Sequence, residues 1–183
     1  MLNRKPYNLL RSQLKTLDIV VFSGSGFVSN AIKFFTKSEW SHCGMVVRDE
    51  ATDTVLVWES TTLNSTKGVQ VNLLSDRVKD YKGKVAFNMF GIELTPSEKI
   101  QIGQIRKRFA NTPYERSVLE LAFSALDFVN IVKGEDLSSL FCSELNAHVL
   151  KNLGYLKGGK PSNEYTPDDM SKIEVVQLPK VFC

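Results

Sequence analysis

Cysteine and histidine are both scarce in this sequence, and this limits the chemistry that it can support. Its three cysteines are widely spaced, and none forms a Cys-x-x-Cys pair. So small and scattered a set excludes a disulfide framework, does not indicate a zinc site, and fits a reducing compartment best. The two histidines, His42 and His148, are the sole candidates for an imidazole base.

A long uninterrupted apolar stretch is also missing. Residues 1–15 carry polar and basic side chains throughout, which argues against a standard signal peptide. The most apolar window, 118–132, is interrupted by Glu120, Asp127 and Asn130 and is too short to span a bilayer. We therefore expect a buried helix there, with peripheral membrane contact as the alternative. A cytoplasmic location is expected, or the host cytoplasm or virion for a viral protein.

The chain has no strong excess of charge of one sign. Its 23 basic and 20 acidic residues give a net charge of +3, and they are dispersed along the sequence. Nucleic-acid binders usually carry a clustered basic footprint, so nucleic acid is not an expected partner. The length of 183 residues and the hydrophobic content of 43% predict one folded domain over residues 1–183.

Runs of β-branched and aromatic residues dominate the first half of the chain, and helical patterns dominate the second half. We expect strands at 16–22, 41–47, 54–58, 68–73, 84–89 and 173–176. Helices are expected at 4–14, 27–37, 75–81, 95–109, 116–132 and 140–150, with a short one opening at Thr166. Thr95 and Thr166 each stand before a proline and three residues before an acidic residue, which is a helix-capping pattern. The fold class is therefore α+β.

His42 stands at the start of a predicted strand, where strand ends usually meet clefts. If the following turn uses residues 49–52, Arg48 faces Asp53 across the hairpin and His42 faces Glu59. A carboxylate in that position can orient an imidazole and stabilise its protonated form. A slip of one residue would place Glu59 on the opposite face, and a purely structural histidine is the alternative.

Cys142 lies near the expected first turn of the helix at 140–150. Backbone N–H groups at a helix N-terminus lower a thiol pKa from about 8.5 and can stabilise a developing oxyanion. Cys142 is therefore the candidate nucleophile, with an inert buried thiol as the alternative. Along its strand, Cys43 alternates away from His42 and is expected to pack in the core. His148 is six residues beyond Cys142, too far round the helix to serve as its base.

Four short segments occur in an order that is characteristic of one group of proteins. They are residues 17–22 (LDIVVF), 41–46 (SHCGMV), 141–145 (FCSEL) and 165–169 (YTPDD). Together they resemble the permuted NlpC/p60 branch of the papain-like superfamily, the YiiX/YebB-like proteins of bacteria and viruses. In that branch the histidine precedes the cysteine, as it does here. The resemblance covers about residues 16–172 and leaves residues 1–15 as an N-terminal helical extension.

The resemblance implies a papain-like fold in which an antiparallel sheet carrying the base packs against the helix carrying the nucleophile. It implies Cys142 as nucleophile, His42 as base and Glu59 as the residue that orients His42, without a metal or organic cofactor. A recurrent acid of the family matches Asp18, to which we assign a structural role at a turn. Cys43 departs from the family, where small or β-branched residues are common.

The function implied is that of a cysteine hydrolase or acyltransferase that acts on an amide or ester bond through an acyl-thioester. Its substrate is a peptide or amino-acyl amide, as in the unpermuted family, or a lipid acyl group, as in related lipid acyltransferases. Trp40 and Tyr165 are expected to bind the substrate. The alternative is a non-catalytic module that binds a peptide or lipid in the same cleft. The sequence predicts no oligomeric state.

Overall fold

The protein is described here by a computed structural model that covers residues 2–63, 65–110 and 138–176. Its centre is a six-stranded sheet with the order β1-β6-β2-β3-β4-β5, in which all neighbours are antiparallel. The strands are β1 (Leu2–Asn3), β2 (Ile19–Ser23), β3 (His42–Asp49), β4 (Thr54–Leu63), β5 (Thr66–Leu73) and β6 (Lys84–Asn88). The strand that begins at His42 therefore lies inside the sheet, between β2 and β4.

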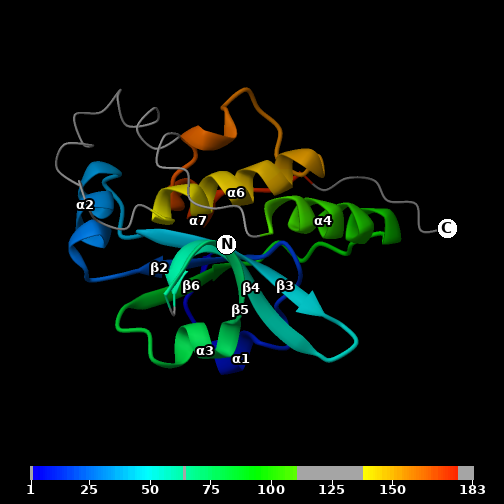
Figure 1. Cartoon of the computed structure of the whole chain (residues 1–183), viewed down its shortest axis with the longest axis horizontal. Coiled ribbons are helices and arrows are strands. Elements are labelled where there is room, and N and C mark those ends of the chain that lie inside the picture. Colours follow the sequence, from blue (N-terminus) through cyan, green and yellow to red (C-terminus); the bar gives the residue numbers. More distant parts are fainter. Residues whose placement is uncertain (1, 64, 111–137, 177–183) are drawn as a thin grey trace.

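Helices cover both faces of the sheet. They are α1 (Tyr7–Leu10), α2 (Phe27–Phe35), α3 (Leu74–Lys79), α4 (Pro96–Phe109), α6 (Ser138–Asn152), the 3-10 helix η1 (Ser162–Glu164) and α7 (Pro167–Lys172). Figure 1 shows α4, α6 and α7 on one side of the sheet and α1 and α3 on the other. The expected α+β class is confirmed, with an antiparallel sheet packed against the helix that carries Cys142.

Alternate positions along the strands supply two separate apolar cores. One core joins Val21 and Met45 to Leu145 of α6, and it continues through α4 and α7. The other joins Phe22 and Val46 to residues of α1 and α3. The position of a residue along its strand therefore decides which helical layer its side chain meets.

Two helices begin at the capping patterns seen in the sequence. The side chain of Thr95 accepts the N–H of Glu98, whose carboxylate accepts the N–H of Thr95 in return. Thr166 and Asp169 form the same reciprocal pair at the start of α7. Such caps satisfy N–H groups that the helix itself leaves unpaired, and replacing the threonine by alanine typically costs about 1 kcal/mol.

Asp18 has the structural role that was expected. Its two carboxylate oxygens accept the backbone N–H of Lys15 and of Phe90, each at 2.8 Å. The side chain is almost completely buried, and this burial raises the pKa of Asp18 from its ordinary value. The carboxyl group thereby ties the turn before β2 to the segment that follows β6.

Two expected elements differ from the structure. The helix expected at 4–14 is reduced to Tyr7–Leu10, because Lys5 precedes Pro6, a position that disfavours helical backbone, while residues 2–3 pair with β6. The strand expected at 173–176 does not form. The outer edge of β6 is occupied by β1, and the N–H of Val176 instead donates to the carbonyl of Tyr155 at 2.8 Å.

The helix expected at 116–132 lies outside the described residues. Within residues 2–63, 65–110 and 138–176, no helix has both the length and the apolar character that crossing a bilayer requires.

Candidate active site

His42 and Glu59 share one face of the sheet, although they are not directly opposite. Arg48 pairs with Val55 and Asp49 with Thr54, so the expected pairing of Arg48 with Asp53 is wrong by two residues. The turn uses residues 50–53 instead of 49–52, so it has the expected length but lies one residue further along the chain, and Asp53 at its end adopts a left-handed φ of 51°. Because a shift of two keeps each side chain on its face, Nε2 of His42 still reaches Oε2 of Glu59, at 2.7 Å.

Gly44 provides the space for this diagonal contact. A Cβ atom at position 44 would lie 2.5 Å from Cγ2 of Val57 and 3.2 Å from Cβ of Glu59. The first distance is shorter than real Cβ contacts, so any side chain here would push against the strand that bears Glu59. The absence of a side chain at position 44 therefore lets β4 lie close enough for its carboxylate to meet the imidazole.

Glu59 is completely buried, and both of its oxygens are hydrogen-bonded. Arg77 donates from Nε to Oε1 at 2.6 Å and from Nη2 to Oε2 at 3.1 Å, and Asn72 donates to Oε1 at 3.2 Å. Burial alone would raise the pKa of Glu59, but the bonds and charges of His42 and Arg77 lower it to about 2. The group is therefore a carboxylate at all ordinary pH values.

Arg77 is the part of this arrangement that the sequence did not reveal. It comes from α3, and its side chain is 12% exposed. Its guanidinium lies over the ring of Phe22, 4.9 Å from the centroid, which holds the group in place by a cation–π contact. No local pattern marks Arg77, because its role arises from the packing of α3 against β4.

The Cys142 sulfur lies beside the first residues of β3. The pairing of β3 with β4 begins at Met45, so the N–H of Cys43 lies outside the paired part of β3. This N–H donates to Sγ of Cys142 at 3.3 Å. The thiol also interacts with the His42 imidazole through a hydrogen bond and through charge. Since Nε2 of His42 is taken by Glu59, Nδ1 is the nitrogen that remains for the sulfur.

The two groups stabilise each other as an ion pair. Burial opposes the charged form of each, yet the hydrogen bonds from Cys43 and the charge of His42 lower the pKa of Cys142 to about 5. In turn, the Cys142 thiolate and Glu59 raise the pKa of His42 to about 9 against the effect of burial. Thiolate and imidazolium therefore coexist around neutral pH.

The cause of this acidity differs from the one expected. The described part of helix α6 starts at Ser138, which makes Cys142 at least the fifth residue of the helix. The first four N–H groups of a helix lack an acceptor within the helix, but the fifth has one. The N–H of Cys142 is thus not positioned as the oxyanion donor that the sequence suggested, and the thiol is acidified by its neighbours on β3.

Cys43 is buried in the core as expected, but it also contacts the candidate nucleophile. Its Sγ lies 3.5 Å from Sγ of Cys142, and Nδ2 of Asn146 donates to it at 3.3 Å. Asn146 is one helical turn beyond Cys142 and is completely buried; within the described part of the chain its Oδ1 has no partner. The alternation of side chains along β3 predicted the face on which Cys43 lies, but it did not predict that Cys142 packs against the same face.

His148 lies on α6 away from this cluster, as its spacing from Cys142 indicated. Its ring packs edge-on against Phe109 of α4, with centroids 5.2 Å apart. Burial lowers the pKa of His148 from its ordinary value, so it is a neutral packing residue near pH 7.

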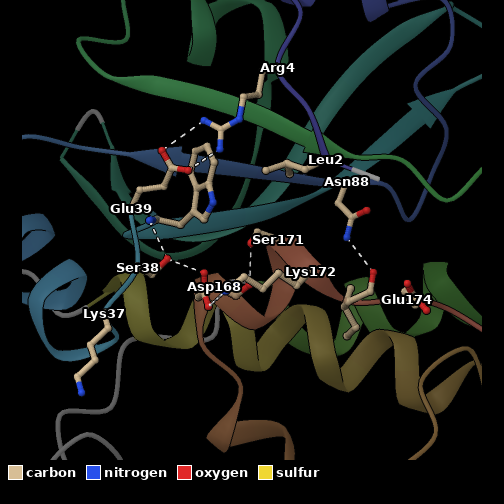
Figure 2. A pocket seen from close by; sticks show the side chains of 12 residues that line it. Leu2, Arg4, Lys37, Ser38, Glu39, Asn88, Asp168, Ser171, Lys172 and Glu174 are labelled. Atoms are coloured by element: carbon tan, nitrogen blue, oxygen red, sulfur yellow. Dashed lines mark hydrogen bonds and ion pairs between the residues drawn. The ribbon is translucent and has the colours of Figure 1, made fainter.

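Trp40 lines a pocket of about 500 Å³ that does not include His42 or Cys142 among its lining residues. Figure 2 shows the charged groups around it, with Arg4 directed at Glu39 and Ser38 at Asp168. The Arg4 guanidinium lies 5.3 Å from the centroid of the Trp40 ring. Trp40 is 2% exposed, so very little of its side chain is open to the pocket.

Two lysines lie over the Tyr165 ring, with Nζ of Lys160 at 4.8 Å and Nζ of Lys151 at 5.4 Å from its centroid. Its backbone carbonyl accepts the hydroxyl of Ser143, next to Cys142, at 2.5 Å. The backbone of Tyr165 thus supports α6 beside the candidate nucleophile. A role of Trp40 or Tyr165 in binding substrate stays a prediction.

Comparisons with known proteins identify the fold. No protein-family model matches the chain, and no curated protein matches its sequence. Its structure is similar to that of the metalloprotein YiiX from Escherichia coli O157:H7, with a TM-score of 0.55 and 24% identity. The match covers 81% of this chain and 71% of YiiX. The chain therefore has a YiiX-like fold, as the order of its motifs predicted.

Proposed function

We propose that the protein is a cysteine-dependent hydrolase or acyltransferase, with Cys142 as nucleophile, His42 as proton carrier and Glu59 as the residue that orients His42. The observation that carries this proposal is the buried series of alternating charges, Cys142 thiolate, His42 imidazolium, Glu59 carboxylate and Arg77 guanidinium. Burying four ionised groups is costly, and such clusters of perturbed groups are typical of functional sites. An acidic thiol beside a base is the arrangement that nucleophilic catalysis requires.

The reaction would begin with attack of the Cys142 thiolate on the carbonyl carbon of an amide or ester. Collapse of the tetrahedral intermediate expels the amine or alkoxide, which takes the proton from the His42 imidazolium and leaves an acyl-thioester. Neutral His42 then removes a proton from water, for hydrolysis, or from an acceptor amine or alcohol, for transfer. Glu59 stabilises each imidazolium state, and Arg77 prevents Glu59 from taking the proton itself.

The acyl group would come from a peptide, an amino-acyl amide or a lipid. Cys142 has no exposed surface, whereas His42 is 8% exposed. A substrate carbonyl must therefore displace the residues that cover the sulfur before attack is possible. The substrate class would be the one whose acyl group displaces these covering residues most effectively.

The comparison with a metalloprotein raises the question of a metal at this site. The oxygens of Glu59 already accept four hydrogen bonds, and the Arg77 guanidinium beside them would repel a cation. The described residues contain no group of three or more histidine, cysteine, aspartate or glutamate side chains arranged to hold a metal. The described donor set thus does not fit a metal ion, and no step of the proposed reaction passes through one.

A non-catalytic binding module is the second candidate, and the burial of Cys142 favours it. In that case the charged series would hold the layers of the fold together, and the cleft would bind a peptide or lipid without cleaving it. The two candidates differ in whether an acyl group ever becomes attached to Cys142.

Acyl-enzyme trapping tests the proposal. The protein is mixed with p-nitrophenyl acetate and with a long-chain p-nitrophenyl ester, quenched in acid, and mapped by mass spectrometry. We expect an acyl group on Cys142, its loss in Cys142→Ala, and slow formation in His42→Ala. Cys183→Ser is the matched control and should behave as the unaltered protein. Equal labelling of Cys142 in the unaltered and His42→Ala proteins, or none in either, would favour the binding module.

A further inference from the structure

Two cysteine sulfurs, from elements almost 100 residues apart in sequence, meet beside the candidate base. Sγ of Cys43 on β3 lies 3.5 Å from Sγ of Cys142 on α6, and no disulfide joins them. A disulfide bond is about 2.05 Å long, so closure requires an approach of about 1.5 Å. The acyl-transfer reaction proposed above makes no use of the Cys43 thiol.

We propose that Cys43 is the resolving thiol of an oxidisable pair, in which a hydroperoxide oxidises Cys142 and Cys43 then closes a disulfide that blocks the nucleophile reversibly. This goes beyond acyl transfer and does not require it, since it depends only on the reactivity of the two thiols. The reactant at this site would be a small oxidant of the hydroperoxide class.

The surroundings assign a different role to each sulfur. Cys142 receives hydrogen bonds from both the N–H and the S–H of Cys43, and it interacts with the charged His42. Burial and the adjacent Cys142 raise the pKa of Cys43 well above its ordinary value, so Cys43 keeps its proton. Peroxides react with thiolates, so the first oxidation falls on Cys142 once the peroxide has passed the residues that cover the sulfur.

The chemistry balances with one hydroperoxide per pair. The Cys142 thiolate attacks the terminal peroxide oxygen, the O–O bond breaks, and a sulfenic acid forms together with hydroxide from hydrogen peroxide or alkoxide from an organic hydroperoxide. The Cys43 sulfur then attacks the Cys142 sulfur, the S–O bond breaks, and the leaving hydroxide takes the Cys43 proton to give water. Two electrons have passed from the two thiols to the peroxide. Nδ2 of Asn146, 3.3 Å from Sγ of Cys43, supports the negative charge that develops there during attack.

The disulfide would inactivate the Cys142 nucleophile and would also protect it from irreversible oxidation. A sulfenic acid without a neighbouring thiol proceeds to sulfinic acid, which dithiothreitol does not reduce. With Cys43 in contact, condensation competes with that second oxidation. The pair therefore converts an irreversible loss of Cys142 into one that a thiol reductant repairs.

Peptide mapping after peroxide treatment tests this proposal. The native protein and Cys43→Ser are treated with hydrogen peroxide, the smallest member of its class, and digested without reduction. We expect a peptide cross-linked through Cys43 and Cys142 in the native protein. In Cys43→Ser we expect Cys142 as sulfinic acid, at about ten times the native yield, with alkylation no longer restored by dithiothreitol. Cys183→Ser should match the native protein.

The native map decides the matter even if Cys43→Ser folds poorly, and Cys43→Ala is a second variant for the same comparison. The proposal is overturned if native Cys142 reaches sulfinic acid as fast as in the variant without any Cys43–Cys142 cross-link. A cross-link of Cys142 to Cys183 in place of Cys43 would overturn it too. Because the readout is thiol chemistry, failure here leaves the acyl-enzyme experiment unaffected.

Discussion

Nε2 of His42 lies 2.7 Å from Oε2 of Glu59, and Oε1 of the same carboxylate accepts Nε of Arg77 at 2.6 Å. Glu59 thus holds one cation from the sheet and one from α3 within a buried site. Removing one member of such a group leaves the other charges buried without compensation, which costs far more than breaking an exposed pair. The site should therefore respond to substitution both in stability and in reactivity.

Glu59→Gln should lower the free energy of unfolding by about 3–5 kcal/mol, because Arg77 would remain buried without its counter-ion. Urea denaturation measures this loss. The matched control is Glu50→Gln, whose ion pair with Lys99 is exposed and spans 2.8 Å. That change should cost less than about 1 kcal/mol. Similar small losses in the two variants would contradict the role assigned to the Arg77–Glu59 pair.

The rate of Cys142 alkylation by iodoacetamide should rise through pH of about 5 and then stay level, following the lowered pKa of Cys142. Acyl transfer should follow the same acid limb and fall above pH of about 9, where His42 loses the proton that the leaving group needs. In His42→Ala the alkylation limb should move to higher pH, because only the hydrogen bonds from Cys43 would remain to oppose the effect of burial. Mass spectrometry locates the label. Identical profiles in both proteins would rule out the ion pair.

Arg77→Met should lower the stability near neutral pH and reduce the further loss of stability in acid. The pKa of Glu59 is lowered from its ordinary value, 4.5, to about 2, so its contribution to stability is complete above pH 4.5 and is lost as pH falls through about 2. Without the Arg77 charge that pKa rises toward 4.5, so both the contribution of Glu59 near neutral pH and the amount lost in acid should be smaller than in the unaltered protein. Thermal unfolding midpoints between about pH 2 and pH 6 measure this. Lys99→Met, which removes an exposed cation, should leave the acid profile unchanged.

Gly44→Ala should destabilise the protein by about 1–3 kcal/mol, because the new Cβ would lie 2.5 Å from Cγ2 of Val57. The displaced strand would also weaken the His42–Glu59 contact, and the pKa of Cys142 in the alkylation assay should rise. At Gly103, within α4, a Cβ meets nothing within 4 Å. Gly103→Ala should therefore stabilise by about 0.5–1 kcal/mol. Equal effects at the two positions would show that Gly44 is not needed for close strand approach.

The sequence was informative wherever a signal is local. The capping residues of α4 and α7, the turn role of Asp18 and the order of histidine and cysteine were all readable from it. The shared face of His42 and Glu59 was readable too, because alternation survives a shift of two residues. The register itself was not, since it depends on the left-handed backbone of Asp53.

Contacts between distant elements were beyond such an analysis. Nothing near Arg77 in sequence shows that α3 will place its guanidinium on Glu59, nor does the strand pattern show that Asn146 and Cys142 will meet Cys43. The segment at 173–176 has the residues of a strand, but a strand also needs an available edge. Two N-terminal residues, Leu2 and Asn3, take that edge.

The nucleophile and its base come from different layers of the molecule, Cys142 from helix α6 and His42 from the sheet. Helix α6, which carries Cys142, packs on Met45 of the sheet, whereas Glu59 on β4 and Arg77 on α3 fix His42. The alignment of the Cys142 sulfur with the His42 imidazole therefore depends on the spacing of the two layers. A misplacement of about 1 Å can lower the reaction rate about 100-fold. Conservative changes at core positions such as Met45 or Leu145 would then lower the reaction rate, although neither residue is part of the charged series.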